Sequence, residues 1–138
     1  MREIKFRGWD NFLKQPIENI LTIKIDRRNN TPCLIIYTKI KININREIKE
    51  LDKIYCNQFV LEQYTGLKDK NGVEIWEGDR VMFQFCQTRY NAIVKYDEKN
   101  TRYILDLYEY HDSTTGLNEL DGKNYFLEVI GNIHEEVN

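Results

Sequence analysis

Hydrophobic and polar residues alternate over short stretches along most of the chain, which is the period of a half-buried β-strand. Residues 39–44 alternate strictly between Ile and a polar residue, and the chain opens with a run in which Ile4 and Phe6 are predicted to enter a core. Other β-rich runs cover residues 20–25, 34–38, 59–64, 81–85, 92–96, 103–108 and 127–133. The pattern predicts many short strands.

Turn-forming residues separate these runs. Residues 69–72 read Asp-Lys-Asn-Gly and residues 77–79 read Glu-Gly-Asp, and both sequences favour tight turns. Residues 26–30 are also turn-prone, and Asn45 is a plausible N-cap for a short helix over residues 45–53. The expected fold is mainly β with minor α, with a small barrel-like C-terminal part and an N-terminal β subdomain.

The length and composition fit one soluble domain. The chain has 138 residues, of which 41% are hydrophobic, and this is enough to form a core without disulfides or metal. We expect a single domain over residues 1–138, with residues 1–53 and 60–138 as possible subdomains. No apolar run approaches the roughly 20 residues of a membrane span, so we expect the protein in the bacterial cytoplasm, away from membranes.

The cysteines and the charges add little specific chemistry. Cys33, Cys56 and Cys86 are too far apart in sequence to form half of a zinc site and are expected to be reduced thiols. The net charge of -2 is uneven, because the first half of the chain is basic and the second half is acidic. This asymmetry allows self-association or binding of a charged partner, although ordinary solvated faces are the favoured explanation.

Three segments carry a specific likeness. Residues 1–10, residues 63–81 and residues 128–135, in this order and at this spacing, resemble the YopX family of phage and prophage proteins. The resemblance implies a small, largely β, cytoplasmic protein with no activity or cofactor that can be transferred. Gly8 replaces the Ala expected there, and Trp76 replaces a Tyr. The motif residues, whose role is unassigned, are Trp9, Tyr64, Gly66, Asp69, Gly72, Trp76, Gly78 and Asp79.

The motif has two interpretations. Its glycines can punctuate turns, and its Asp side chains can accept hydrogen bonds from turn amides, so the motif is explained as a folding signature. A binding role for the same residues remains open. We favour the folding interpretation because turn chemistry alone requires these residue types.

Side chains capable of catalysis do not form a convincing constellation. Asp69, Glu74, Glu77 and Asp79 offer oxygen ligands for Mg²⁺ and would suit a metal-dependent phosphodiesterase, but surface and turn carboxylates are the more common explanation. Residues 111–114 contain His, Asp, Ser and Thr, yet neighbouring residues cannot align as a triad. His134 is predicted to be a surface residue. No catalytic residue, metal ligand or cofactor is predicted.

A basic strand provides a second candidate surface. Arg27, Arg28, Lys39 and Lys41 are candidate contacts to nucleic-acid phosphates, although Lys on an exposed strand also prevents edge-to-edge aggregation. The leading hypothesis is therefore a non-catalytic binding or accessory protein that acts on a host or phage macromolecule, a protein rather than a nucleic acid. Nucleic-acid binding, phosphodiesterase activity and homo-oligomerisation stay as alternatives.

Overall fold

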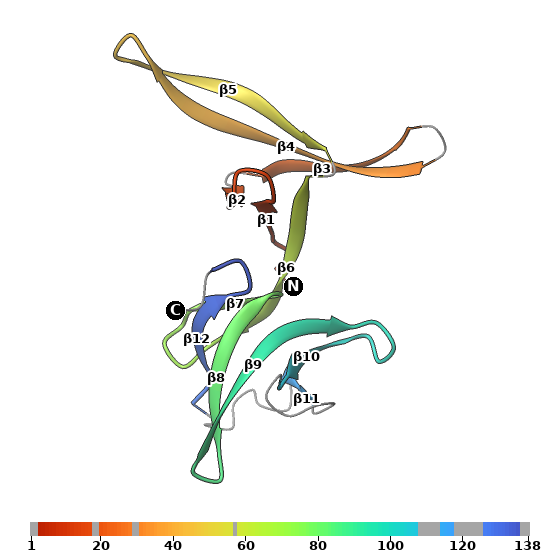
Figure 1. The fold of residues 1–138 in the computed structure, drawn as a ribbon, viewed down its shortest axis with the longest axis vertical. Coiled ribbons are helices and arrows are strands. Elements are labelled where there is room, and N and C mark those ends of the chain that lie inside the picture. The colour runs from red at the N-terminus through yellow and green to blue at the C-terminus, as the bar shows by residue number, and fades with distance from the viewer. Residues whose placement is uncertain are drawn as a thin grey trace. The chain divides into compact units, whose positions relative to one another are not determined.

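The computed structural model describes residues 3–17, 20–28, 31–56, 58–107, 114–117 and 126–135. The chain forms two compact units, one of Phe6–Leu61 and one of Met1–Lys5 with Glu62–Asn138. The fold is mainly β, as predicted (Figure 1). The strands are β1 (Phe6–Asp10), β2 (Gln15–Ile17), β3 (Ile20–Arg28), β4 (Thr31–Ile44), β5 (Glu47–Cys56), β6 (Phe59–Lys68), β7 (Glu74–Trp76), β8 (Asp79–Phe85), β9 (Thr88–Asp97), β10 (Arg102–Asp106), β11 (Thr114–Gly116) and β12 (Glu128–Asn132).

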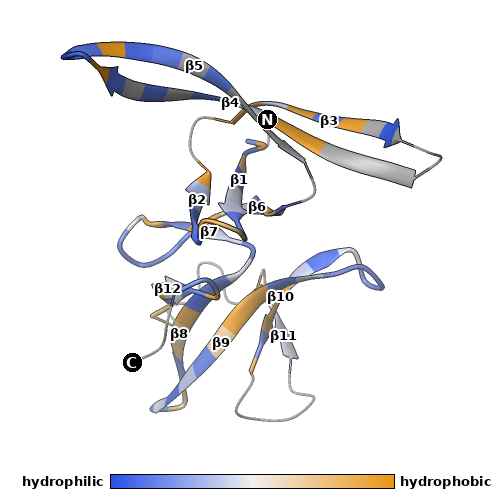
Figure 2. Ribbon diagram, turned by 45° about the horizontal axis from the view of Figure 1, so that its top comes forward, coloured by the Kyte–Doolittle hydropathy of each residue, from blue (hydrophilic) through white to orange (hydrophobic). Residues whose placement is uncertain are grey.

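The C-terminal unit contains a curled, half-barrel sheet. Its strand order is β11-β10-β9-β8-β12, and every pairing for which a register is described is antiparallel. Alternate residues of β8 and β9 are buried, and Figure 2 shows the apolar centre of β9 between hydrophilic ends. The core is formed by Ile75, Val81, Phe83, Ala92, Val94, Tyr103, Leu105, Leu107 and Leu117. The predicted barrel-like C-terminal part is therefore confirmed.

The N-terminal unit is organised around the 14-residue strand β4. Residues 31–38 of β4 pair with β3, and residues 35–44 pair with β5, so two antiparallel hairpins share one strand and overlap over only a few residues. Ile35, Ile36 and Thr38 lie in this overlap and are buried. Ile36 packs with Ile17, and the partly buried residues Ile20, Phe59 and Leu61 complete this small core.

The predicted helix over residues 45–53 is wrong. Asn45 and Arg46 have φ values of 52° and 66° and form the turn between β4 and β5. Two consecutive positive φ values are typical of the type I′ turn that suits a two-residue hairpin. From Glu47 onwards the chain pairs with β4, and this long ladder outweighs the weak helical pattern of Ile48 and Leu51.

The predicted burial of Ile4 and Phe6 is also wrong, because both side chains are exposed. The buried positions of the opening segment are Gly8 and Asp10. A Cβ atom at Gly8 would lie 3.2 Å from Ile17 on the paired strand β2, so only a very small residue fits there comfortably.

Other expectations fall partly outside the described residues. Residues 111–113 of the rejected triad lie outside them, and Thr114 begins β11. Cys86 is an exposed free cysteine, whereas the side chains of Cys33 and Cys56 are not described. Among the described residues, no helix has the length and apolarity that a membrane crossing requires. The single domain with subdomains 1–53 and 60–138 stays a prediction.

Candidate functional site

The middle and C-terminal segments that resemble the YopX family meet within the C-terminal unit, together with Lys5 of the opening segment. Residues 63–81 run through most of β6, the turn after it, β7 and the start of β8. Residues 128–135 form β12 and the turn that follows. Lys5, from the opening segment, belongs to the same unit. The contacts among these segments show which motif residues stabilise the fold.

Asp69 connects the middle segment to the C-terminal segment. Its Oδ1 atom accepts hydrogen bonds from the backbone N–H groups of Asn71 at 2.8 Å and Val73 at 2.9 Å. Its Oδ2 atom accepts a hydrogen bond from the backbone N–H of Val129, in β12, at 2.9 Å. A buried carboxylate that accepts three backbone N–H bonds is a strong structural connection.

Backbone hydrogen bonds strengthen this connection on both sides of Asp69. Lys70 N–H donates to the carbonyl of Leu127 at 2.9 Å, and Ile133 N–H donates to the carbonyl of Gly78 at 2.9 Å. Between these bonds β12 pairs antiparallel with β8. We call β12 and its flanking residues 127 and 133–135 the C-terminal strap. From Leu127 to Ile133 the strap pairs with or bonds to residues between Asp69 and Met82.

The second aspartate of the motif closes the turn between β7 and β8. The Oδ2 atom of Asp79 accepts a hydrogen bond from the backbone N–H of Trp76 at 2.8 Å, and Asp79 is buried. Gly78 occupies this turn with a φ of +82°, a conformation that favours glycine. The predicted turns at residues 69–72 and 77–79 are therefore confirmed.

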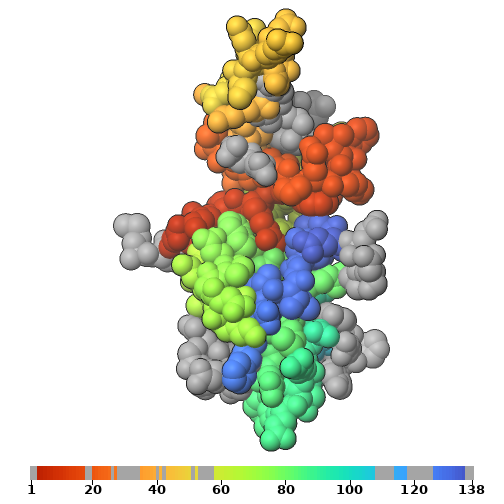
Figure 3. All heavy atoms as spheres, turned by 90° about the vertical axis from the view of Figure 1, so that its left-hand side faces the viewer, coloured from red at the N-terminus to blue at the C-terminus, as the bar shows by residue number. Residues whose placement is uncertain are grey.

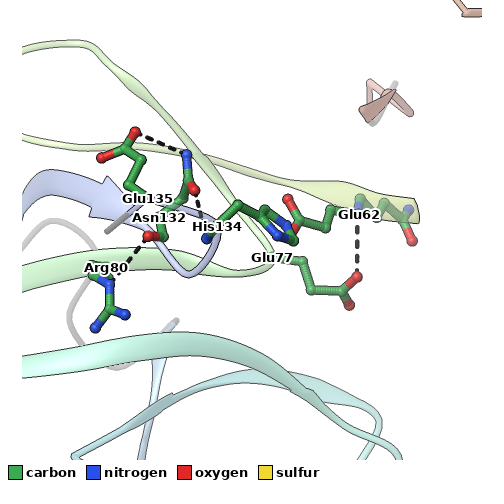
Figure 4. Close-up of polar contacts among 7 residues, drawn as sticks. Glu62, Glu77, Arg80, Asn132, His134 and Glu135 are labelled. Carbon is green, nitrogen blue, oxygen red and sulfur yellow. Dashed lines mark hydrogen bonds and ion pairs between the residues drawn. The ribbon is translucent and has the colours of Figure 1, made fainter. Parts of the chain in front are cut away.

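A buried acid-histidine pair lies next to this turn (Figure 4). The Nε2 atom of His134 lies 2.5 Å from the Oε1 atom of Glu62, and their side chains are only 11% and 4% exposed. The prediction of His134 as a surface residue is therefore wrong. The turn after β12 directs the ring inward, because the Oδ1 atom of Asn132 accepts a hydrogen bond from His134 N–H at 2.9 Å.

Sequence analysis missed this pair for a physical reason. Glu62 immediately precedes the middle family segment, and an acidic residue in a strand is normally assigned to the solvent-facing side. His134 does lie in the third family segment, and this was the one available signal. The partnership joins residues 72 positions apart, which local periodicity does not reveal.

A second carboxylate lies in the same region. Burial raises the pKa of Glu77, the negative charge of Glu62 raises it further, and a hydrogen bond from Gln63 N–H opposes these effects. That N–H lies 3.4 Å from the Oε1 atom of Glu77. Glu62 contacts His134 of the strap, and Glu77 contacts the backbone of β6.

The opening segment contacts the middle segment through Lys5. Its carbonyl accepts a hydrogen bond from Tyr64 N–H at 2.9 Å, and its Nζ atom lies 2.5 Å from Glu74 and 5.1 Å from the centre of the Tyr64 ring. The Tyr64 and Trp76 rings pack with their centroids 5.4 Å apart. Lys5 of the opening segment is therefore connected to the middle segment within one unit, and the middle segment is connected there to the C-terminal segment.

The remaining motif residues occupy separate positions. Gly66 is exposed in β6, with a φ of +87°, and Gly72 has a φ of +79° in the turn after it. Trp9 is half-buried in β1, opposite Pro16, and belongs to the other unit.

The candidate Mg²⁺ ligands are not assembled as a metal site. Asp69 and Asp79 bond to turn amides, Glu74 to Lys5, and Glu77 to the backbone of Gln63. In the part of the chain that the structure describes, no group of three or more His, Cys, Asp or Glu side chains is arranged to hold a metal ion.

The candidate nucleic-acid contacts are spread along the N-terminal unit. Arg27 and Arg28 pair with Pro32 and Thr31 at one end of the β3–β4 hairpin. Lys39 and Lys41 lie beyond the end of β3, where β4 pairs only with β5. Thr31 and Lys39 are eight positions apart, which is roughly 26 Å along a strand. The backbone does not bring the four residues together.

The architecture defines a class: a small, mainly β protein whose curled sheet is held by a C-terminal strap. The chain belongs to the YopX family, because the YopX protein family matches residues 5–138. The structure is similar to the crystal structure of protein EF1440 from Enterococcus faecalis, with a TM-score of 0.61 and 26% identity over 98% of this chain and 96% of that chain. It also resembles the crystal structure of protein yopX from Bacillus subtilis, with a TM-score of 0.55 and 15% identity over 99% and 96% of the two chains. No curated protein matches.

Substitution of Gly78 tests the packing around Glu62. A Cβ atom at Gly78 would lie 2.5 Å from the Oε1 atom of Glu62, which is buried against His134 and not free to move. Gly78→Ala is expected to lower the free energy of unfolding by about 1–2 kcal/mol for the backbone conformation, and by roughly a further 1–3 kcal/mol for the disturbed Glu62 contacts. Chemical denaturation measures this loss.

Gly72→Ala is the matched control, because Gly72 has a similar φ of +79° and no atom within 4 Å of the added Cβ. This variant should lose only the smaller amount of unfolding free energy, the amount that comes from the strained backbone conformation. Equal losses in the two variants would contradict the packing of Glu62 against Gly78.

Glu77→Gln tests the electrostatics of this region. Because the pKa of Glu77 is raised above its ordinary value of 4.5 in the folded state, ionisation of this carboxyl destabilises the fold at higher pH. Wild type and variant should be equally stable at low pH, and the variant should become the more stable one as pH rises through the folded-state pKa. Denaturation midpoints measured across this pH range, with the exposed Glu98→Gln as control, test this. A pH-independent difference would contradict it.

Proposed function

We propose that this protein is a non-catalytic binding or accessory protein of a bacteriophage or prophage, and that its target is a host or phage protein. The phage setting is an inference from YopX membership. Support for binding rather than catalysis comes from the family residues themselves. Their carboxylates and His134 are engaged with backbone amides and with one another, in positions that stabilise the strap and its turns.

The observation that carries the proposal is the end of the β4–β5 hairpin. Every residue from 43 to 50 is exposed, including Ile44 at 41% and Ile48 at 74%. Figure 3 shows the yellow-orange atoms of this hairpin as a projection from its unit. Ile44 pairs with Glu47 and Ile48 with Asn43, so each apolar side chain lies on a different face of the hairpin. We call residues 43–48 the hairpin tip.

A hairpin end that exposes one Ile on each face suits insertion into a groove of another protein. An exposed Ile on each face of a two-stranded hairpin buries little apolar surface within its own chain and so adds little stability. An isolated hairpin is only marginally stable in water. Binding to a partner would remove this apolar surface from water and would also stabilise the hairpin. A few well-buried residues carry most of the binding energy of a protein interface.

The charges of the same hairpin favour a protein over a nucleic acid. Lys39 is paired with Asp52, and Lys41 is paired with Glu50, across the two strands. Each lysine therefore has a carboxylate-bearing neighbour on its own face, which offsets the positive potential that phosphate binding requires.

Co-purification from a bacterial host, preferably one that carries the corresponding phage, tests the proposal. Tagged wild type is compared with Ile44→Asn/Ile48→Asn, in which the tip becomes polar without changing the turn. The matched control is Val73→Asn/Phe85→Asn, which changes two exposed apolar residues of the other unit. Circular dichroism establishes that each variant is folded.

A specific protein that is reduced at least about tenfold by the tip variant and retained by the control variant is the expected result. Tenfold corresponds to about 1.4 kcal/mol, which is within the range for loss of an apolar side chain at an interface. Recovery of nuclease-sensitive nucleic acid, or of proteins that bind wild type and the tip variant equally, would overturn the proposal.

A further inference from the structure

The outer edge of β3 is open to another strand. β3 is the end strand of the order β3-β4-β5, and no strand among the described residues pairs with its other side. Leu21 and Ile25 on this strand are 60% and 73% exposed. An exposed edge strand with large apolar side chains is a ready template for strand addition.

We propose that the β3 edge binds a second copy of this chain, antiparallel and two-fold symmetric, with Ile25 on the symmetry axis. The two three-stranded sheets would then form one six-stranded sheet in the order β5-β4-β3-β3-β4-β5. Such an interface is isologous and closes as a dimer. This inference is independent of the function proposed for the hairpin tip.

The charges of β3 match this register. With Ile25 on the axis, Lys24 lies opposite Asp26 of the second copy, and the symmetry repeats that pair. Arg27 and Arg28 then lie opposite Ile23 and Thr22 of the second copy, so no like charges face each other. Directly opposed opposite charges stabilise an antiparallel strand pair, and like charges destabilise it.

Neighbouring registers lack this match. A shift by one residue places Ile25 opposite a charged residue, either Lys24 or Asp26 of the second copy. A shift by two residues places Lys24 opposite Lys24, or Asp26 opposite Asp26. A lysine in the middle of an edge strand normally blocks self-pairing. The aspartate two residues later removes this block for one register.

The positions directly opposite these two residues on β4 are occupied by uncharged residues. Lys24 is exposed and lies opposite Ile35 of β4, and the position of Asp26 is opposite Cys33. Their charges are therefore not explained by pairing within the sheet. Reversing either charge introduces no like-charge pair between β3 and β4, which makes the pair suitable for a charge-swap experiment.

The experiment measures the mass in solution of the full chain, by sedimentation equilibrium over a range of protein concentrations. Lys24→Asp and Asp26→Lys each create two like-charge contacts across the axis, and the double variant Lys24→Asp/Asp26→Lys restores opposite charges. Lys49→Asp is the matched control, because Lys49 is an exposed lysine on β5 that also lies opposite an uncharged residue, Ile42. Circular dichroism checks that each variant is folded.

The expected result is a wild-type dimer, a dimer dissociation constant raised about tenfold or more by each single reversal, and recovery in the double variant. Lys49→Asp should leave the dimer unchanged. A monomeric wild type, a dimer unaffected by the single reversals, or a double variant that fails to recover would each overturn the proposal. Because no other partner takes part, these outcomes do not depend on whether the hairpin tip binds a protein.

Discussion

The hydrogen bonds from backbone amides to the Asp69 carboxylate hold the C-terminal unit together. The curled sheet has β12 as an end strand, and β12 comes from a segment more than 45 residues beyond the turn it contacts. Asp69 joins the two, because one oxygen organises its own turn and the other accepts Val129 N–H. Glu62 and His134 add a buried contact where the strap ends. The middle and C-terminal family segments supply the residues of these contacts. This explains why the turn residues of one segment and the terminal residues of the other are found in the same protein.

Much of this fold is predictable from the sequence, because strands and tight turns have local causes. Alternation identified β8, and the Asp-Lys-Asn-Gly sequence identified the turn at Asp69. The helix expected over residues 45–53 failed because helical spacing of two apolar residues is a weak signal against a hairpin ladder. Burial of Ile4 and Phe6 failed because alternation gives the period of a strand without telling which face is covered. The Glu62–His134 pair was not predictable, since its partners meet only through the tertiary fold.

The two units differ in how their side chains are engaged. In the C-terminal unit, the polar residues of the family segments are engaged in internal contacts. In the N-terminal unit, one long strand supports two hairpins, and only their short overlap is buried. The parts beyond the overlap carry exposed Ile side chains at the hairpin tip and on β3. The polar groups of the family segments therefore stabilise one unit, and in the other unit we propose that Ile44 and Ile48 at the hairpin tip and Ile25 on β3 make contacts with partners.

The most direct test of this account is chemical denaturation of Asp69→Asn, with Asp97→Asn as control. Asp97 also accepts turn hydrogen bonds, but at an exposed turn and from residues close in sequence. An amide has one acceptor oxygen, so Asp69→Asn cannot serve both its turn and Val129. We expect Asp69→Asn to lower the free energy of unfolding by about 2 kcal/mol or more, and Asp97→Asn to lower it clearly less. Equal, small losses at both positions would contradict the central role of Asp69.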